Sequence, residues 1–96
     1  MKTSNDRPLK EVLQELIEIY RLEGKLNEVK AVHSWEKVVG EMIARHTKDL
    51  YIRNGKLFVK IDSPALKNEL SYSSSVIVEK INTEAGSKVV GEIIFI

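Results

Sequence analysis

The stretch Lys48–Asp62, KDLYIRNGKLFVKID, sets the architecture that the rest of the chain must fit. Apolar and polar residues alternate on both sides of Asn54-Gly55, which predicts a tight β-hairpin because both turn positions take a positive φ. If these two residues form the turn, the facing pairs are Arg53 and Lys56, Ile52 and Leu57, Tyr51 and Phe58, Leu50 and Val59, and Asp49 and Lys60. The expected core face of the hairpin then consists of Leu50, Ile52, Leu57, Val59 and Ile61.

Two helices are expected before the hairpin. The first follows Pro8, ends at Gly24, and carries apolar residues at helical spacing. The second is capped by Asn27 and has Trp35 at the centre of its buried face, with a bend or close contact expected at Gly40. The stripe of the first helix consists of Leu9, Val12, Leu13, Leu16 and Tyr20.

One helix and one strand are expected after the hairpin. Ser63-Pro64 predicts the cap and first residue of a helix that ends at Gly86, with a distortion at Ser73 and Ser74. The last strand, KVVGEIIFI, covers residues 88–96 and leaves two choices of buried face. We expect Val89, Ile93 and Phe95 to face the core, although Val90, Ile94 and Ile96 form an almost equally apolar alternative.

The order helix, helix, strand, strand, helix, strand predicts an α+β fold with helices packed on one face of a three-stranded sheet. We expect a flexible tail over residues 1–7 and a single domain over residues 8–96. The residues expected to form the centre of its core are Trp35, Val39, Leu57, Val59 and Leu70.

Composition removes several classes of function. The 96 residues have no cysteine, which excludes disulfides, thiolate zinc sites and cysteine nucleophiles, and the net charge of +1 does not indicate a strongly basic nucleic-acid binder. The first residues lack the apolar stretch of a signal peptide, and no apolar run approaches the roughly 20 residues needed to cross a bilayer. We therefore expect a cytoplasmic protein with no membrane association.

The polar residues do not indicate an enzyme. If one straight helix holds both His33 and His46, they lie on different faces and cannot share a metal ion, so we expect no metal and no cofactor. The serines of SYSSS, residues 71–75, have neither a glycine elbow nor an adjacent base. We expect no catalytic residues.

The outer face of the hairpin is the best candidate for a functional site. There Tyr51 lies beside Phe58 with Arg53, Lys56 and Lys60 around them, and we include Lys48 and Lys67 as further nucleic-acid-binding residues. Aromatic rings that stack on bases, next to cations that neutralise phosphates, suit single-stranded DNA or RNA. The alternative is that the aromatic pair only stabilises the hairpin and the lysines only keep it in solution.

A second alternative uses the same face for a protein partner. If Val90, Ile94 and Ile96 point outward, they extend Tyr51 and Phe58 into an apolar patch that suits protein–protein interaction or homodimerisation.

Several sequence features occur together in one bacterial family. Trp35 is followed by VVG and IARHT, then by the hairpin YIRNGKLFVKI, by SPALKNEL, and by a late IN..AG before the closing apolar strand. This series resembles the DciA-like family, also called domain of unknown function 721, in a short form that consists of the K-homology-like domain only. The resemblance implies a type II K-homology fold and a nucleic-acid-binding role in DNA replication, as an accessory in loading the replicative helicase. The GxxG loop of K-homology domains has no match between Ser63 and Gly86, so binding of nucleic acid would need another surface.

Overall fold

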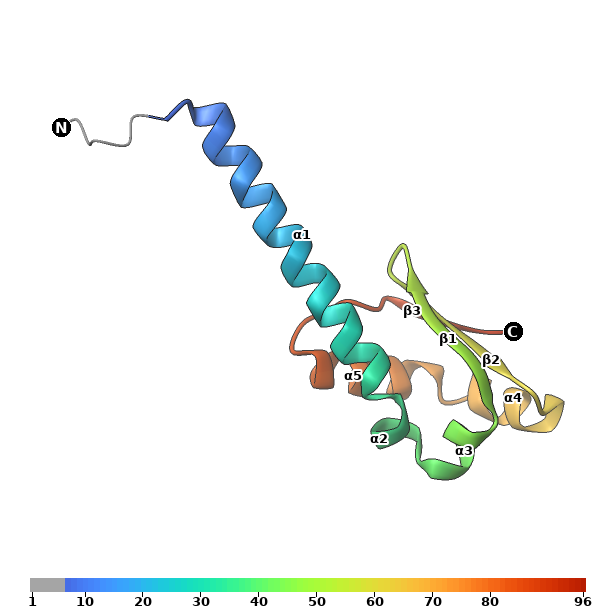
Figure 1. Cartoon of the computed structure of the whole chain (residues 1–96). Coiled ribbons are helices and arrows are strands. Elements are labelled where there is room, and N and C mark those ends of the chain that lie inside the picture. Colours follow the sequence, from blue (N-terminus) through green and yellow to red (C-terminus); the bar gives the residue numbers. More distant parts are fainter. Residues whose placement is uncertain (1–6) are drawn as a thin grey trace.

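A computed structural model describes residues 7–96 and confirms the predicted α+β fold (Figure 1). Most of the expected tail lies outside the described residues. The K-homology likeness stays a prediction. The elements in chain order are α1 (Leu9–His33), α2 (Trp35–Val39), α3 (Glu41–Arg45), β1 (Thr47–Arg53), β2 (Lys56–Ile61), α4 (Pro64–Ser71), α5 (Ser74–Ala85) and β3 (Glu92–Phe95).

The hairpin has the predicted register. Asn54 and Gly55 form its turn with φ of 52° and 73°, and all five expected pairs face each other across antiparallel strands β1 and β2. β3 pairs with β2 in parallel, so the sheet is mixed and its order is β1-β2-β3. The helical connection through α4 and α5 is what a parallel pairing requires.

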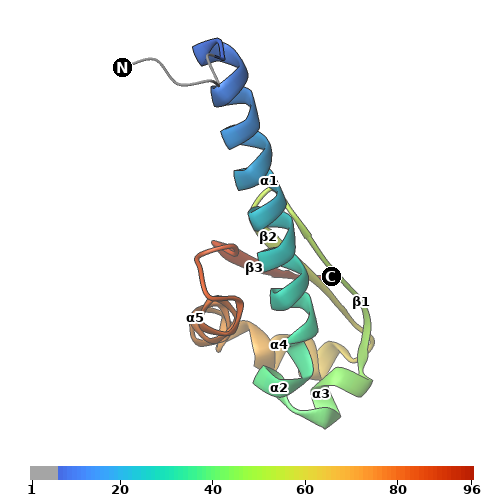
Figure 2. The same cartoon turned by 60° about the vertical axis from the view of Figure 1, so that its left-hand side comes forward.

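The core lies between one face of this sheet and the helices. Leu57 and Val59 of β2 are at most 1% exposed, whereas Phe58, between them on the opposite face, is half-buried. This alternation confirms the predicted core face of the hairpin, and Figure 2 shows the helices gathered beside the sheet. Of the predicted core residues, Trp35, Leu57, Val59 and Leu70 are buried, and Val39 packs against them while half-buried.

The first helix differs from the prediction. Gly24 does not end it, and Asn27 does not cap a second helix; α1 runs unbroken for 25 residues to His33. A glycine inside a helix costs about 1 kcal/mol relative to alanine, which packing of the C-terminal part of α1 against α5 and β1 can outweigh. Asn27 instead donates a hydrogen bond from Nδ2 to Ser87 Oγ at 3.0 Å, which ties α1 to the loop before β3.

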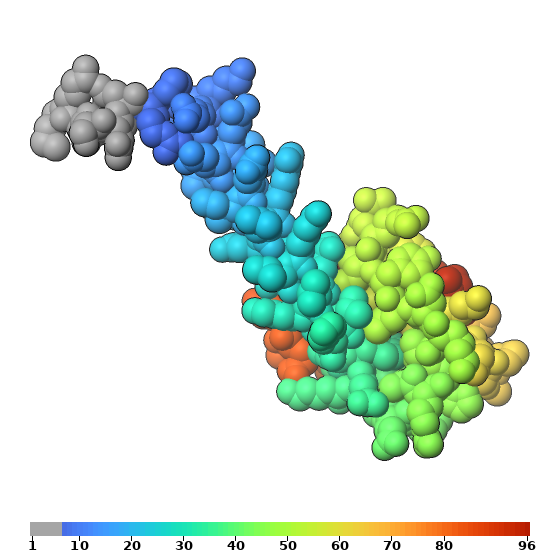
Figure 3. Space-filling model, in the orientation of Figure 1, coloured from blue at the N-terminus to red at the C-terminus, as the bar shows by residue number. Residues whose placement is uncertain are grey.

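The predicted stripe on α1 is largely uncovered. Leu9 is 72% exposed and Tyr20 68%, and Figure 3 shows this part of α1 extending away from the rest of the molecule. Local spacing predicts the helix but not whether anything packs on it, and here the domain covers only the C-terminal part. Ala31, the buried residue of α1, marks the covered part.

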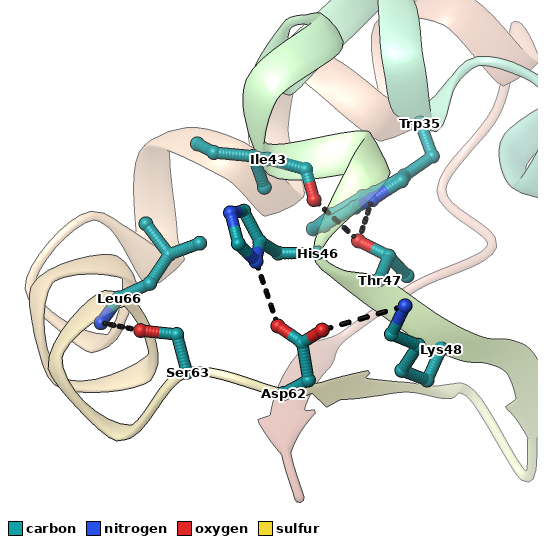
Figure 4. Close-up of polar contacts among 8 residues, drawn as sticks. All are labelled: Trp35, Ile43, His46, Thr47, Lys48, Asp62, Ser63 and Leu66. Carbon is teal, nitrogen blue, oxygen red and sulfur yellow. Dashed lines mark hydrogen bonds and ion pairs between the residues drawn. The ribbon is translucent and has the colours of Figure 1, made fainter.

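Trp35 connects the short helices to the sheet. α2 and α3 meet at Gly40, whose φ of 94° confirms the predicted bend. The indole Nε1 of Trp35 donates to Thr47 Oγ1 at 2.9 Å, and Thr47 Oγ1 donates to the carbonyl of Ile43 at 2.8 Å (Figure 4). The first residue of β1 is thus held by both short helices.

The segment after the hairpin also follows the prediction, with one change. Ser63 caps α4, accepting a hydrogen bond at Oγ from the Leu66 amide at 3.3 Å, and Gly86 ends α5 with φ 81°. The single expected helix is two helices, and the break falls at Tyr72 and Ser73, beside the predicted distortion. Serine side chains compete for backbone hydrogen bonds and so weaken a helix at such a point.

Candidate nucleic-acid interface

The face of the sheet that points away from the helices, here called the outer face, has an apolar row across its centre. The rings of Tyr51 and Phe58 are stacked, with centroids 5.1 Å apart and an angle of 14° between their planes. Ile94 of β3 pairs with Phe58 on its other side. All three side chains are half-buried, so each keeps a surface that a ligand can reach.

Cations flank the apolar row. Arg53 lies with Cζ 5.7 Å from the centroid of the Tyr51 ring, a cation–π contact, and Lys56 faces Arg53 at the hairpin end. Lys60 lies beyond the row on the opposite side, and all three cations are exposed. Among the residues that the structure describes, no carboxylate forms an ion pair with any of the three.

The outer face also carries two acidic residues. Asp49 faces Lys60, and Glu92 pairs with Lys56 in the strand register, so the face has three cations and two anions. Asp49 Oδ1 accepts a hydrogen bond from the Leu50 amide at 2.9 Å, which satisfies part of its charge locally. The outer face is therefore weakly positive, and its aromatic stack is the more distinctive feature.

Two of the predicted cationic residues lie elsewhere. Lys67 is on α4, where it lines a groove of about 470 Å³ with Ile93 and Phe95, which belong to the core side of β3. Lys48 lies at the start of β1 with Nζ 3.4 Å from Asp62 Oδ2. The structure brings Tyr51, Arg53, Lys56, Phe58 and Lys60 together but does not add Lys48 and Lys67 to the same cluster.

Sequence reasoning missed one cation near the hairpin turn. Lys88 lines a shallow groove with Asn54, Gly55 and Lys56. Lys88 and Lys56 are 32 positions apart, and the segment before β3 brings them together because the Gly91 amide donates to the carbonyl of Gly55 at 2.8 Å. No local pattern in the sequence signals this proximity.

A second groove lies beside the aromatic row. It has a volume of about 380 Å³ between α1 and β1, and Tyr51 lines it together with Leu50 and Ile52. Lys25, Glu28 and His33 of α1 also line it, so polar groups that include both a cation and an anion lie beside an apolar floor. The size falls within the range of small-molecule sites, and the groove lengthens the surface available next to Tyr51.

The proposed partner interface needs a correction. Val90 does not point outward: it is 0% exposed. The reason is that Val90 precedes the start of β3 at Glu92, and the side chain of Asn82 holds its backbone through hydrogen bonds of 2.9 Å from the Val90 amide to Oδ1 and 2.8 Å from Nδ2 to the Val90 carbonyl. Within β3 the first choice of core face is confirmed, because Ile93 is buried and Phe95 packs against the core.

The other two residues of that interface stay accessible. Ile94 is half-buried on the outer face, and Ile96 is 45% exposed. Ile96 continues the pairing of β3, since its amide donates to the Val59 carbonyl and its carbonyl accepts from the Ile61 amide. Without Val90 the apolar patch is smaller than predicted.

The histidines occupy separate sites because they belong to different elements, and not because they lie on different faces of one helix as the spacing predicts. His33 and His46 do not share one straight helix, because breaks at Ser34 and Gly40 separate them. His33 is exposed at the end of α1, and His46 Nδ1 lies 2.7 Å from Asp62 Oδ1. Within residues 7–96 no three His, Asp or Glu side chains are grouped so that they could hold a metal ion.

Asp62 links the start of β1 to the end of β2. His46 and Lys48 both contact its carboxylate (Figure 4). The hydrogen bond from His46 is the largest effect and lowers the pKa of the Asp62 carboxyl below its ordinary value. Partial removal of the carboxylate from water raises this pKa, and the contact with Lys48 lowers it again.

This lowered pKa is testable by titration. In a carbon-13 NMR titration, the Asp62 carboxyl should titrate below the ordinary range of aspartates, and its pKa should rise in His46→Ala more than in Lys48→Ala. Folding lowers the pKa of the Asp62 carboxyl, so its ionised form stabilises the folded protein at pH values above the pKa of Asp62 in the unfolded chain. This contribution to stability is lost as the pH falls through the pKa of Asp62 in the folded protein. An Asp62 midpoint within or above the ordinary range of aspartates would contradict the assignment.

The fold and site define a small α+β domain with an aromatic pair and flanking cations on an open face of its sheet. The chain belongs to the DciA family: the family model described as Dna[CI] antecedent, DciA matches residues 8–95. It is also similar to a UPF0232 protein of Corynebacterium glutamicum (strain R), with 33% identity over 60 residues. That match covers 62% of this chain and 34% of the relative, so the chain matches about a third of the relative's length. In the part of the chain that the structure describes, no helix is long and apolar enough to span a membrane.

Proposed function

We propose that this protein is a non-enzymatic, nucleic-acid-binding adaptor that acts as an accessory of the bacterial replicative helicase in DNA replication. The proposed binding of nucleic acid rests on one observation, the stack of Tyr51 and Phe58 on an open face of the sheet. Arg53 lies beside it, with Cζ 5.7 Å from the centroid of the Tyr51 ring. Membership of the DciA family supports the helicase part.

The proposed mode of binding follows from the arrangement of the outer face. Bases stack on the exposed surfaces of Tyr51, Phe58 and Ile94, while the phosphates pass Arg53 and Lys56 at one end and Lys60 at the other. Stacking on aromatic side chains tolerates any base and is worth about 1–3 kcal/mol per base, so we expect little sequence specificity. The cations make the affinity depend on salt. A plot of the logarithm of the binding constant against the logarithm of the salt concentration should have a slope of about −2, from three phosphate contacts at roughly −0.7 each.

Titration of fluorescently labelled single-stranded DNA at low and moderate salt tests this proposal. Tyr51→Ala and Phe58→Ala should each weaken binding about tenfold, because each removes one stacking surface. Lys56→Glu should weaken binding. It should also make the slope of log binding constant against log salt concentration less negative by the contribution of about one phosphate contact or more. The matched controls are Tyr72→Ala, since Tyr72 is 79% exposed on another part of the molecule, and Lys80→Glu on α5, and both should bind as the unmodified protein does.

The result also separates the proposed surface from its alternatives. Absence of binding at low salt, or equal losses in Tyr51→Ala and Tyr72→Ala, would contradict the outer face as the binding surface. If Tyr51→Ala changes only stability, the stack serves the hairpin alone. A parallel titration with single-stranded RNA determines which nucleic acid is preferred.

The helicase part needs its own measurement. Immobilised protein should retain the purified replicative helicase of the source organism, with and without single-stranded DNA. If no helicase is retained in either condition while DNA binding is intact, the adaptor role fails and the nucleic-acid-binding role stands.

A further inference from the structure

The strand β1 forms one edge of the sheet and directs a row of its backbone groups away from the other strands. The sheet order of the described residues is β1-β2-β3, so β2 is the neighbour of β1 on one side and the other side is open. Arg53 and Lys56 flank the two-residue turn and form a hydrogen-bonded pair, and such pairs alternate with non-hydrogen-bonded pairs along an antiparallel ladder. Leu50 and Ile52 therefore belong to non-hydrogen-bonded pairs, with their amides and carbonyls directed to the open edge.

Two hydrogen bonds support this assignment. Val59 faces Leu50, and the Val59 carbonyl accepts from the Ile96 amide at 2.8 Å, so the backbone of Val59 points away from β1. The Leu50 amide donates at 2.9 Å to Oδ1 of Asp49, a side-chain acceptor in its own strand. Among residues 7–96, no backbone group outside β1 and β2 pairs with Leu50 or Ile52.

An apolar groove follows the same edge. It is the groove of about 380 Å³ between α1 and β1, with Val29 and Val32 on the α1 side and Leu50 and Ile52 on the β1 side. A residue that pairs with Leu50 or Ile52 places its own side chain on the same face of the sheet, so this side chain enters the groove. Figure 2 shows β1 on the open side of the sheet with α1 beside it, so the edge and the groove form one site.

The edge and the groove together fit an extended peptide strand. Outward amides and carbonyls need main-chain partners, and a strand supplies one donor and one acceptor at every second residue. Apolar side chains at these same residues fill the groove. Addition of a strand to an open sheet edge is a recurring mode of peptide recognition. A single strand of nucleic acid lacks the repeated main-chain amides that this edge requires.

A second copy of this chain does not fit the edge. If the β1 strands of two copies paired antiparallel, the two sheets would join and both α1 helices would lie on the same face of the joined sheet. Because α1 packs against β1, each helix would have to enter the groove of the other copy. A groove of about 380 Å³ is too small for a helix of roughly 10 Å diameter. The edge therefore suits a strand that carries no helix of its own.

Charges along β1 define the ends of the partner strand. Asp49, Tyr51 and Arg53 alternate with Leu50 and Ile52 along β1 and lie on the outer face. An antiparallel strand with an acidic residue opposite Arg53 and a basic residue opposite Asp49 gains two cross-strand ion pairs. The incoming carbonyl opposite Leu50 replaces the Asp49 carboxylate as acceptor, which releases this carboxylate to pair with the basic residue.

We propose that the edge of β1 and the groove beside α1 bind an extended segment of a partner protein as a fourth strand of the sheet. The segment runs antiparallel to β1, pairs with the backbones of Leu50 and Ile52, and has apolar residues at these two positions. The site uses the backbone of β1 and the core side of its edge, whereas the proposed nucleic-acid site uses the outer face. It therefore goes beyond the proposed function and does not depend on it.

The probe is the peptide Glu-Val-Thr-Val-Lys, blocked at both ends, with glutamate opposite Arg53, the two valines opposite Ile52 and Leu50, and lysine opposite Asp49. In an NMR titration at millimolar peptide, the amide signals of Leu50 and Ile52 should shift and saturate. Hydrogen exchange of the Ile52 amide should slow about fivefold or more, because this amide gains an acceptor. The Leu50 amide should slow less, since it already donates to the Asp49 carboxylate.

Two altered peptides separate the backbone from the side chains. N-methylation of both valines removes the donors to the carbonyls of Leu50 and Ile52 and keeps the apolar side chains. Replacement of both valines by serine keeps the backbone and removes the apolar groups from the groove. Each change should raise the dissociation constant about tenfold or more.

A matched pair of protein variants tests the groove. Val29→Glu places a charge where the valines enter and should weaken binding about tenfold. Leu26→Glu is the control, because Leu26 is 61% exposed on the same helix and does not line the groove, and it should bind as the unmodified protein does. Val29 is itself 54% exposed, so both variants should keep the fold, which far-ultraviolet circular dichroism verifies. No saturable shift at Ile52, equal binding of the N-methylated peptide, or equal losses in the two variants would overturn the proposal.

Discussion

Replacing Trp35 with alanine is expected to lower the free energy of unfolding by about 3–5 kcal/mol. Trp35 is 4% exposed and belongs to the same buried cluster as Leu57 and Val59 of the sheet. Its removal leaves a cavity beneath the short helices and takes away the indole donor that contacts Thr47 Oγ1 at 2.9 Å. α2 then loses its hydrogen bond to the first residue of β1.

Urea denaturation followed by far-ultraviolet circular dichroism measures this loss, since tryptophan fluorescence is absent from the variant. Trp35→Phe separates packing from hydrogen bonding, because it keeps an aromatic ring but no indole donor, and its loss should be smaller. Tyr72→Ala removes an aromatic side chain that is 79% exposed and should change stability little. A loss below about 1 kcal/mol in Trp35→Ala would contradict its role in the core.

Replacing Asn82 with leucine is expected to cost about 3 kcal/mol, although leucine has a similar size. Asn82 lies on α5, and its side chain accepts from the Val89 amide at 3.1 Å and the Val90 amide at 2.9 Å and donates to the Val90 carbonyl at 2.8 Å. Leucine would take these partners from the Val90 amide and carbonyl, whose side chain is fully buried, whereas the Val89 amide also donates to the Ser87 carbonyl at 3.0 Å. An unsatisfied buried polar group costs about 1–3 kcal/mol.

Two further variants make the Asn82 prediction specific. Asn82→Asp keeps an acceptor for the two amides and loses the donor to the carbonyl, so its cost should be lower than that of Asn82→Leu. Thr83→Ala changes the next residue, which is exposed on the same helix, and should have a small effect. Equal stability of Asn82→Leu and the unmodified protein would show that these hydrogen bonds do not hold the segment before β3.

The hairpin was predictable residue by residue because its information is local. A two-residue turn fixes the register of both strands, and the period of two then assigns each side chain to a face. The grouping of Tyr51, Arg53, Lys56, Phe58 and Lys60 follows from these two rules alone. The caps at Ser63 and Gly86 were predictable for the same reason, since each depends on a residue and its immediate neighbours.

The errors lie where distant segments meet. Gly24 has the local character of a helix stop, but contacts of α1 with α5 and β1 outweigh its cost. Val90 has the alternation of an outward residue, but Asn82 of α5 fixes its backbone before the strand begins. Lys88 joins the hairpin end, and Lys67 lies away from it, because of the path taken by the connection between β2 and β3.

The sequence by itself therefore determined the α+β class, the hairpin register and the aromatic pair with its flanking cations. Tertiary structure alone decided that β3 places Ile94 beside Phe58, that Val90 is buried, and that α1 continues past the domain with an uncovered apolar strip. The physical reason is that turn geometry and side-chain alternation act over a few residues, whereas burial depends on which distant segments pack together. Spacing identifies an apolar face, and only the assembled fold shows whether that face is filled or left for a partner.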